Sequence, residues 1–163
     1  MTFLDEAAWF KSLPTMFGSA AALITSVSGD VLLVKPNYRD HWNLPGGILE
    51  EGEPPHAGCA REVLEEIGLS IEVGPLLAVD WVAPEGNQPR PAVAFIFDGG
   101  VLADPSVIVL QESELDEWRF VPPADVAEFV PPRRALRVTA GLRARGAGTE
   151  PGAGAVYVPA IAD

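Results

Sequence analysis

The sequence predicts an α+β fold in which helices pack on a mixed sheet as a compact α/β/α sandwich. Two apolar runs within residues 16–35, divided by the turn Gly29-Asp30, predict an antiparallel hairpin. After the hairpin, segments with helical periodicity, such as residues 54–67, alternate along the chain with short apolar runs typical of strands. The chain has 163 residues, of which 48% are hydrophobic, and this is enough for one domain with its own core.

The first predicted element is a helix over residues 5–13, closed by Pro14, with Ala8, Trp9 and Leu13 packed inward. Further strands are predicted after the hairpin, at residues 71–83 (interrupted at Gly74-Pro75), 91–100, 107–110 and 117–122. Further helices are predicted at 54–67, 123–130 and 133–146. We assign residues 1–145 to the domain. Residues 146–163, rich in Gly, Ala and Pro, are expected to form a poorly ordered tail with little packing power.

The charge and the cysteine content exclude several classes of protein. A net charge of −12 argues against a protein that binds the phosphate backbone of nucleic acids. Small anionic substrates stay open, provided that a metal ion screens their charge. The single cysteine, Cys59, allows no internal disulfide and fits a reducing compartment. The N-terminus does not resemble a signal peptide and no apolar run reaches membrane-spanning length, so we expect a cytoplasmic protein without membrane contact.

The helix over residues 54–67 carries the strongest chemical signal. It begins at a proline and ends before Gly68, which is the usual asymmetry of helix ends. One side gathers apolar side chains, namely Ala57, Ala60, Val63, Leu64 and Ile67. Glu62, Glu65 and Glu66 fall on roughly the opposite side, where like charges at this spacing repel. We expect this acidic patch to face away from the core and to attract a cation.

Carboxylate oxygens at this density suit Mg²⁺, which takes a few carboxylates together with substrate phosphates and water. A bare acidic run on a helix is more often a solvated face, but the flanking residues favour a site. Gly46 and Gly47 permit a sharp turn before the helix. Glu53 stands at the helix start, and Arg61 can orient a carboxylate by charged hydrogen bonds.

The run from Gly47 through Glu53 and Arg61 to "REVLEEIGL" resembles the Nudix box, G-x5-E-x7-R-E-U-x-E-E-x-G-U, with every defined position filled. The resemblance implies a Nudix-type α/β/α sandwich with a mixed central sheet. It also implies a hydrolase of nucleoside diphosphates linked to another moiety, X. In the family, the glutamates that match Glu62, Glu65 and Glu66 bind Mg²⁺ or Mn²⁺. The family residues that match Gly47, Glu53 and Gly68 support the site structurally. The resemblance further implies that Arg61 is a catalytic residue together with Glu65 and Glu66.

Outside the box, a further family glutamate often serves as metal ligand or general base. Glu112 is the first candidate for this role and Glu114 the second, both in the acidic loop "QESELDE". Tyr38 and Arg39 in the irregular segment before the box, and Arg90 after a Pro-rich loop, are candidate substrate contacts. Trp42 is expected to pack beside the turn. The basic residues of "RRALRVTAGLRAR" are expected to form one solvated helix face.

The substrate stays open between an ADP-ribose or nucleotide-sugar type, which is favoured, and a (deoxy)nucleoside triphosphate. Pro84 stands close to a proline that marks ADP-ribose-type members, but out of register. Gly86 stands where dinucleoside polyphosphate hydrolases carry tyrosine, which counts against that group. A catalytically silent nucleotide sensor and a plain acidic interaction module are the other readings. A homodimer stays open, with "AVYVPAIA" as a contact segment to test.

Overall fold

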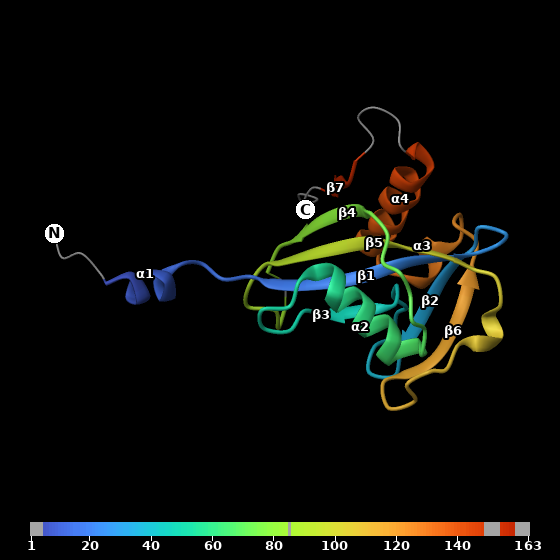
Figure 1. The fold of residues 1–163 in the computed structure, drawn as a ribbon, viewed down its shortest axis with the longest axis horizontal. Helices are drawn as coiled ribbons and strands as arrows, with labels where there is room; N and C mark the ends of the chain where they lie inside the picture. Colours follow the sequence, from blue (N-terminus) through green and yellow to red (C-terminus); the bar gives the residue numbers. More distant parts are fainter. Residues whose placement is uncertain (1–4, 85, 149–153, 159–163) are drawn as a thin grey trace.

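A mixed β-sheet forms the centre of the computed structural model, which describes residues 5–84, 86–148 and 154–158 (Figure 1). Its strands are β1 (Phe17–Ser26), β2 (Val31–Pro36), β3 (Gly46–Ile48), β4 (Leu76–Val82), β5 (Ala92–Leu102), β6 (Leu115–Val121) and β7 (Val156–Val158). The helices are α1 (Glu6–Ser12), α2 (Pro55–Ile67), the 3-10 helix η1 (Pro105–Val107), α3 (Val126–Phe129) and α4 (Pro132–Ala147). None of the described helices combines the length and the apolar character needed to cross a bilayer.

Strand β1 organises the sheet. The order is β6-β2-β1-β5-β4-β7, and β3 adds to β1 outside this path. β1 is antiparallel to β2, as the hairpin prediction requires, and also to β3, but it is parallel to β5. The sheet is therefore mixed, as predicted.

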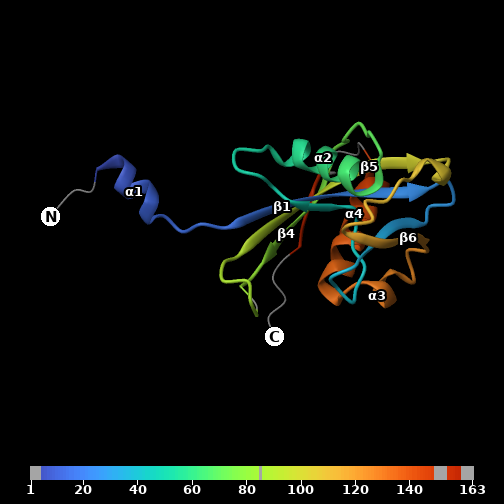
Figure 2. The same ribbon diagram turned by 90° about the horizontal axis from the view of Figure 1, so that it is seen from below.

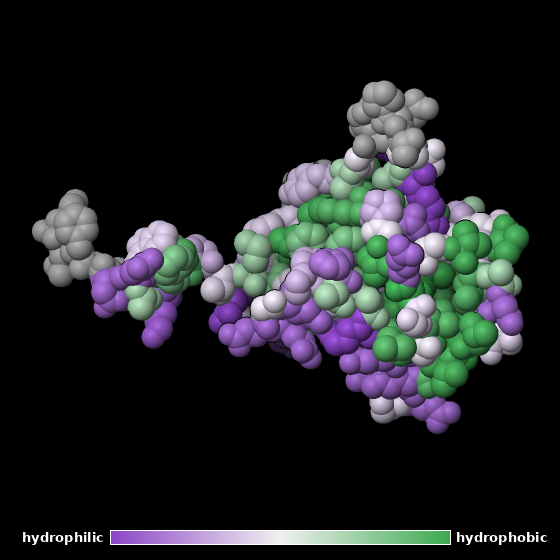
Figure 3. Space-filling model, viewed as in Figure 1, coloured by the Kyte–Doolittle hydropathy of each residue, from purple (hydrophilic) through white to green (hydrophobic). Residues whose placement is uncertain are grey.

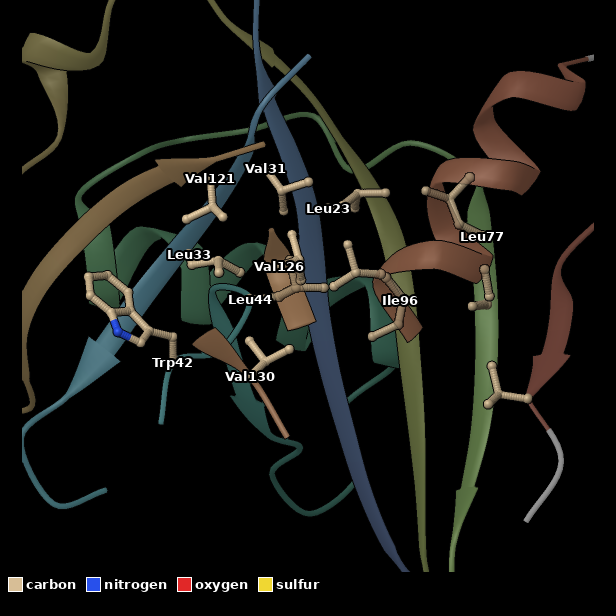
Figure 4. Close-up of a cluster of buried hydrophobic side chains, with 14 residues drawn as sticks. Leu23, Val31, Leu33, Trp42, Leu44, Leu77, Ile96, Val121, Val126 and Val130 are labelled. Atoms are coloured by element: carbon tan, nitrogen blue, oxygen red, sulfur yellow. The ribbon is translucent and has the colours of Figure 1, made fainter. Parts of the chain in front are cut away.

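Alternation along β1 and β2 divides the core into two layers, because successive side chains of a strand point to opposite faces. Ala22, Ile24 and Leu32 pack on the face that α2 covers, against Cys59 and Val63. Leu23, Val31 and Leu33 point to the other face, where Val126 of α3 and Val138 of α4 complete the core (Figure 4). Figure 2 shows α2 on one side of the sheet and α3 and α4 on the other. The predicted sandwich is confirmed.

Helix α1 forms where predicted but does not pack inward. None of its residues is buried, and Trp9 is 49% exposed. Figures 1 and 3 show the helix standing off from the sheet. The expectation that Ala8, Trp9 and Leu13 join the core was wrong; the helix is held by a local cap, in which Asp5 Oδ1 accepts from the Ala8 N–H at 2.9 Å.

The predicted strand at 107–110 is absent from the described structure. This segment instead follows η1 across the C-terminal end of α2. The Val109 N–H donates to the Ile67 carbonyl (3.0 Å), and the Gln111 N–H donates to the Glu66 carbonyl (2.9 Å). Carbonyls at a helix end lack intrahelical partners, and this apolar segment supplies them.

The prediction of a poorly ordered C-terminal tail was wrong for residues 156–158, which form strand β7. β7 pairs in parallel with β4, and Val158 is buried against α4. The three-residue run "VYV" is too short to give a recognisable strand period in the sequence. The remaining tail residues, 149–153 and 159–163, lie outside the described residues.

The basic residues of α4 do not form a solvated face. Arg137 donates to Asp80 (Nε to Oδ2, 2.6 Å), and Arg133 also pairs with this fully buried carboxylate (Nη2 to Oδ1, 2.5 Å). Arg145 pairs with Asp98 on β5 (2.6 Å). The partners lie far away in the sequence, so helical periodicity alone could not reveal them.

Candidate active site

The turn that precedes α2 brings the box against strand β1. Ala20 pairs with Gly47, and Ala21 pairs with Gly46, in the β1–β3 ladder. Gly46 has a φ of +145°, and a Cβ there would lie 2.2 Å from the Ala20 carbonyl oxygen. A Cβ on Gly47 would instead lie 2.5 Å from the Glu62 carboxylate carbon. The first glycine therefore lets the backbone pass β1, and the second makes room for a carboxylate.

Helix α2 begins after Pro54 and ends at Gly68, which has a φ of +69°, as the sequence predicted. Its buried face differs from the predicted one. Glu66 is only 8% exposed, whereas Leu64 is 52% exposed. The helix turns Glu66 toward the β3 turn, where the Gly46 N–H donates to it, and Gly58 packs closely against Leu49 and Glu53. Of the acidic patch, Glu66 is therefore buried, whereas Glu65 is half-exposed to solvent.

Glu66 is the buried carboxylate at the centre of the site. Its Oε2 accepts a hydrogen bond from the Gly46 N–H at 2.8 Å. Burial raises its pKa to about 8, and the nearby carboxylates of Glu62 and Glu114 act in the same direction. Burial likewise raises the pKa of Glu62. These two carboxylates are held where a negative charge is costly unless a cation is present.

Arg61 ties the acidic residues to the helix start. Its Nε and Nη2 donate to the two carboxylate oxygens of Glu53 at 2.8 and 2.9 Å, and its Nη1 donates to Glu62 (3.0 Å) and Glu65 (2.9 Å). The hydrogen bonds from Arg61 lower the pKa of Glu53 to about 2. Glu53 in turn accepts from the Glu50 N–H at 3.0 Å, which fixes the loop before α2. Arg61 thus positions the carboxylates, as a bidentate guanidinium can.

Within the described residues, no group of three or more His, Cys, Asp or Glu side chains is arranged as a metal cage. Arg61 Nη1 holds one carboxylate oxygen each of Glu62 and Glu65. The chemistry of the donor set nevertheless fits a hard divalent cation. Glu62 and Glu66 are carboxylates with raised pKa values beside a third, Glu114, and a cation would relieve the cost of their charges.

A cavity of about 370 Å³ opens beside these carboxylates. Of the predicted site residues, the structure brings Glu62, Glu66 and Gly47 to its wall, together with Tyr38 and Arg39. Glu65 is half-exposed at the edge of the patch. Trp42 is buried against Phe129 (ring centroids 5.8 Å apart), which confirms its predicted packing role.

Glu112 and Arg90, both predicted site residues outside the box, are not brought to the cavity. Glu112 is exposed and is not among the described residues that line it, whereas Glu114, the second candidate, is. The Glu114 carbonyl accepts from the Asn37 N–H at 2.9 Å, which anchors the loop at this point. Arg90 is also absent from the described lining, and its guanidinium lies over the Phe17 ring at 5.8 Å from the centroid. The catalytic and binding roles of these residues stay predictions.

Sequence reasoning missed the opposite wall, which α4 supplies. Arg134 and Arg137 line the cavity there, along with Asn43 and the partly buried Phe95. The only sequence signal was the run of arginines at the start of α4, and nothing in the run distinguishes a residue facing a cavity from one facing solvent.

The carboxylate-rich turn and helix lie within a segment that matches a known protein family. The sequence model of the NUDIX domain matches residues 16–139. The chain belongs to the Nudix family. A MutT-like protein of Streptomyces ambofaciens is 32% identical over 150 residues, which cover 90% of each chain. The chain is accordingly a Nudix hydrolase, a pyrophosphohydrolase that acts on phosphoric anhydrides.

Solved structures agree with the Nudix fold. The MutT protein of Methanosarcina mazei Go1 has a TM-score of 0.66 at 26% identity, covering 85% of this chain and 100% of that one. A UDP-X diphosphatase has a TM-score of 0.69 at 22% identity, covering 96% of this chain and 77% of its own. The second likeness shows the fold alone.

Proposed function

We propose that this Nudix hydrolase cleaves the pyrophosphate bond of a nucleoside diphosphate linked to another moiety, with ADP-ribose or a nucleotide sugar as the favoured class. The observation that carries the proposal is the buried Glu66 carboxylate on the cavity wall, beside Glu62 and Glu114. Such a group of carboxylates suits a reaction in which a divalent cation and a polyphosphate are bound together. We further propose that the enzyme works in nucleotide metabolism in the cytoplasm, which its single, buried cysteine supports.

Glu62, Glu65 and Glu66 are the residues that would hold Mg²⁺, with Mn²⁺ as a substitute. The ion would offset the charge of the pyrophosphate and promote ionisation of the attacking water. Arg61 and Glu53 keep the carboxylates in place, and Gly46 holds Glu66 by its N–H. The cation would thus supply the positive charge, and the side chains of the protein would position the reacting groups and accept a proton.

The proton acceptor is proposed to be a glutamate of the loop before β6. The sequence favours Glu112, but the position of Glu114 on the cavity wall makes Glu114 the better candidate. Glu112 stays a candidate only if the loop moves when substrate binds.

The dimensions and lining of the cavity support a substrate with a second moiety beyond the pyrophosphate. The wall extends from the carboxylates past Phe95 and Val82 to α4, a surface with both apolar and polar groups. A (deoxy)nucleoside triphosphate is the alternative. A catalytically silent, nucleotide-sensing Nudix domain is the third possibility. Whether the enzyme works as a homodimer is a separate question.

A nucleotide panel with Mg²⁺ tests the proposal. ADP-ribose, UDP-glucose and a set of nucleoside triphosphates would be incubated with the enzyme. Released phosphate would be measured after coupling to a phosphatase for the linked substrates and to an inorganic pyrophosphatase for the triphosphates. We expect nucleoside monophosphate from the linked substrates and little release from the triphosphates. The reverse preference would favour the triphosphate alternative, and binding without release would favour the sensor.

Glutamine variants test the residues. Glu66→Gln is expected to lower kcat about a hundredfold or more, and Glu51→Gln, an exposed change in the neighbouring turn, serves as the matched control. Glu114→Gln is expected to lower kcat about a hundredfold, with a smaller effect for Glu112→Gln. Full activity of Glu66→Gln at saturating Mg²⁺ would refute the proposed metal site. An inactive Glu112→Gln beside an active Glu114→Gln would return the base to Glu112.

A further inference from the structure

One arginine on the cavity wall has no partner in the described structure. Arg134 of α4 is half-buried, and its Nη1 is shielded from solvent without a hydrogen bond to any described residue. Burial, followed by the positive charges of Arg137 and Arg39, lowers its pKa to about 10. A buried guanidinium without a hydrogen-bond partner is costly, since its desolvation is not offset.

The other arginines that α4 directs toward the sheet are satisfied. Arg133 and Arg137 share the buried Asp80, and Arg145 binds Asp98 and the hydroxyl of Thr25 (3.1 Å). The chain therefore places carboxylates opposite its structural arginines. Arg134 is the exception, and it is also an arginine that lines the cavity.

The surroundings of Arg134 are basic. Arg39, on the loop between β2 and β3, lines the same cavity, with its guanidinium 5.5 Å from the centroid of the Tyr38 ring. The pKa of His41 is lowered by burial and then by Arg134, Arg39 and Lys35, with Asp40 opposing them. Asn43 also lines the cavity, and its Oδ1 is buried without a partner among the described residues.

The two ends of the cavity therefore carry opposite charges. Glu66 has carboxylates as its charged neighbours, namely Glu62, Glu114 and Glu65. Arg134 has arginines as its main charged neighbours. A pyrophosphate with its cation belongs at the acidic end, so the basic end is left for a different anionic group of the same ligand.

We infer that Arg134, together with Arg39, binds an anionic group, a phosphate monoester or a carboxylate, on the moiety X of the substrate. This inference rests on the proposed function and narrows it to nucleoside diphosphates whose linked moiety is itself negatively charged. Arg134 supplies the shielded donor, and the exposed Arg39 supplies a second charge at the cavity mouth.

Matched substrate pairs test the inference. UDP-glucuronate differs from UDP-glucose by a carboxylate on the sugar, and the 1″-phosphate of ADP-ribose differs from ADP-ribose by a phosphate on the distal ribose. The wild-type kcat/KM is expected to be about tenfold or more higher for the charged member of at least one pair. Arg134→Leu is expected to bring that ratio close to one. Arg143→Leu, an exposed position of the same helix, should keep the wild-type ratio.

Equal kcat/KM values within both pairs for the wild-type enzyme, or a ratio that Arg134→Leu leaves unchanged, would overturn the inference. Coenzyme A and dephospho-coenzyme A form a third pair, which differs by a phosphate on the nucleoside. Discrimination in this pair alone would assign the subsite to the nucleoside and refute its assignment to X.

A binding experiment separates this inference from the proposed function. If no panel member is cleaved, the proposed function fails, and metal-free titration with ribose 5-phosphate decides on the subsite. Saturable binding that weakens about tenfold in Arg134→Leu supports the inference, and equal binding by both proteins overturns it. If Arg134→Leu does not fold, Arg39→Leu, at an exposed loop position, takes its place in both experiments with the same expected outcomes.

Discussion

The adjacent glycines of the β3 turn are expected to fail in different ways when each is replaced by alanine. At Gly46 the new Cβ would lie 2.2 Å from the Ala20 carbonyl oxygen and 2.5 Å from the Ala21 Cα, both backbone atoms of the central strand. The φ of +145° adds strain for any residue with a Cβ. Strain of this kind costs about 1–3 kcal/mol, and overpacking costs a similar amount. Gly46→Ala should therefore lose about 4 kcal/mol, a large part of the stability of an ordinary domain.

Gly47→Ala meets only a side chain. Gly47 is not among the described glycines with positive φ, and its new Cβ would lie 2.5 Å from the Glu62 carboxylate carbon. A relaxed contact needs about 3.5 Å, so the carboxylate must move by roughly 1 Å. This side chain can rotate, so we expect a stability change below about 1 kcal/mol. A displacement of 1 Å in a reacting group costs about a hundredfold in rate, which we expect for kcat.

Urea denaturation and steady-state kinetics of both variants would test this contrast. Gly46→Ala should shift the unfolding midpoint strongly, and Gly47→Ala should shift kcat with a nearly unchanged midpoint. Wild-type turnover by Gly47→Ala would show that Glu62 need not occupy its observed place. A wild-type midpoint for Gly46→Ala would refute the argument from the β1–β3 contact.

Three further predictions concern stability. Burial raises the pKa of Glu66 from 4.5 to about 8, so the folded metal-free protein keeps a proton that the unfolded chain releases. Its free energy of unfolding should therefore fall by about 2–4 kcal/mol as pH rises from 4.5 to 8. Glu66→Gln should flatten this pH profile, and a flat profile for the wild-type protein would contradict the prediction. Asp80→Ala should lower the free energy of unfolding, measured in urea, by about 3–5 kcal/mol, because it leaves Arg133 and Arg137 without their carboxylate partner. A loss no larger than that of Asp116→Ala, a change at an exposed position, would refute the pairing. Val158→Asp should lower the melting temperature by several degrees, equivalent to about 2–3 kcal/mol, whereas Tyr157→Asp on the exposed side of β7 should not. Equal effects of the two substitutions would mean that β7 does not pack against the domain.

The sequence by itself determined the parts of the site that lie close together in the chain. The bounds of α2 and its glycine end at Gly68 follow from spacing along one helix. The resemblance to the Nudix box implied the supporting role of Glu53, which the structure pairs with Arg61. The hairpin of β1 and β2 was readable for the same reason, since two apolar runs divided by a short Gly-Asp turn are a local feature. The predicted mixed sheet depended on the order of such elements.

Even within α2, the sequence could not determine the rotation of the helix on the sheet. Periodicity placed Leu64 on the apolar side, yet the structure exposes it and buries Glu66. The hydrogen bond from Gly46 to Glu66 and the close packing of Gly58 against Leu49 and Glu53 fix the rotation, and both join α2 to residues outside the helix.

The remaining features required the tertiary structure, because each joins segments that are distant in the sequence. Whether Glu112 or Glu114 reaches the cavity depends on backbone hydrogen bonds from the loop to α2 and to Asn37. The role of α4 depends on which of its arginines meets a carboxylate on β4 or β5, and that is decided by where the helix lies across the sheet. Local spacing fixes the direction of a side chain relative to its own element, but only the packing of elements fixes what that side chain meets.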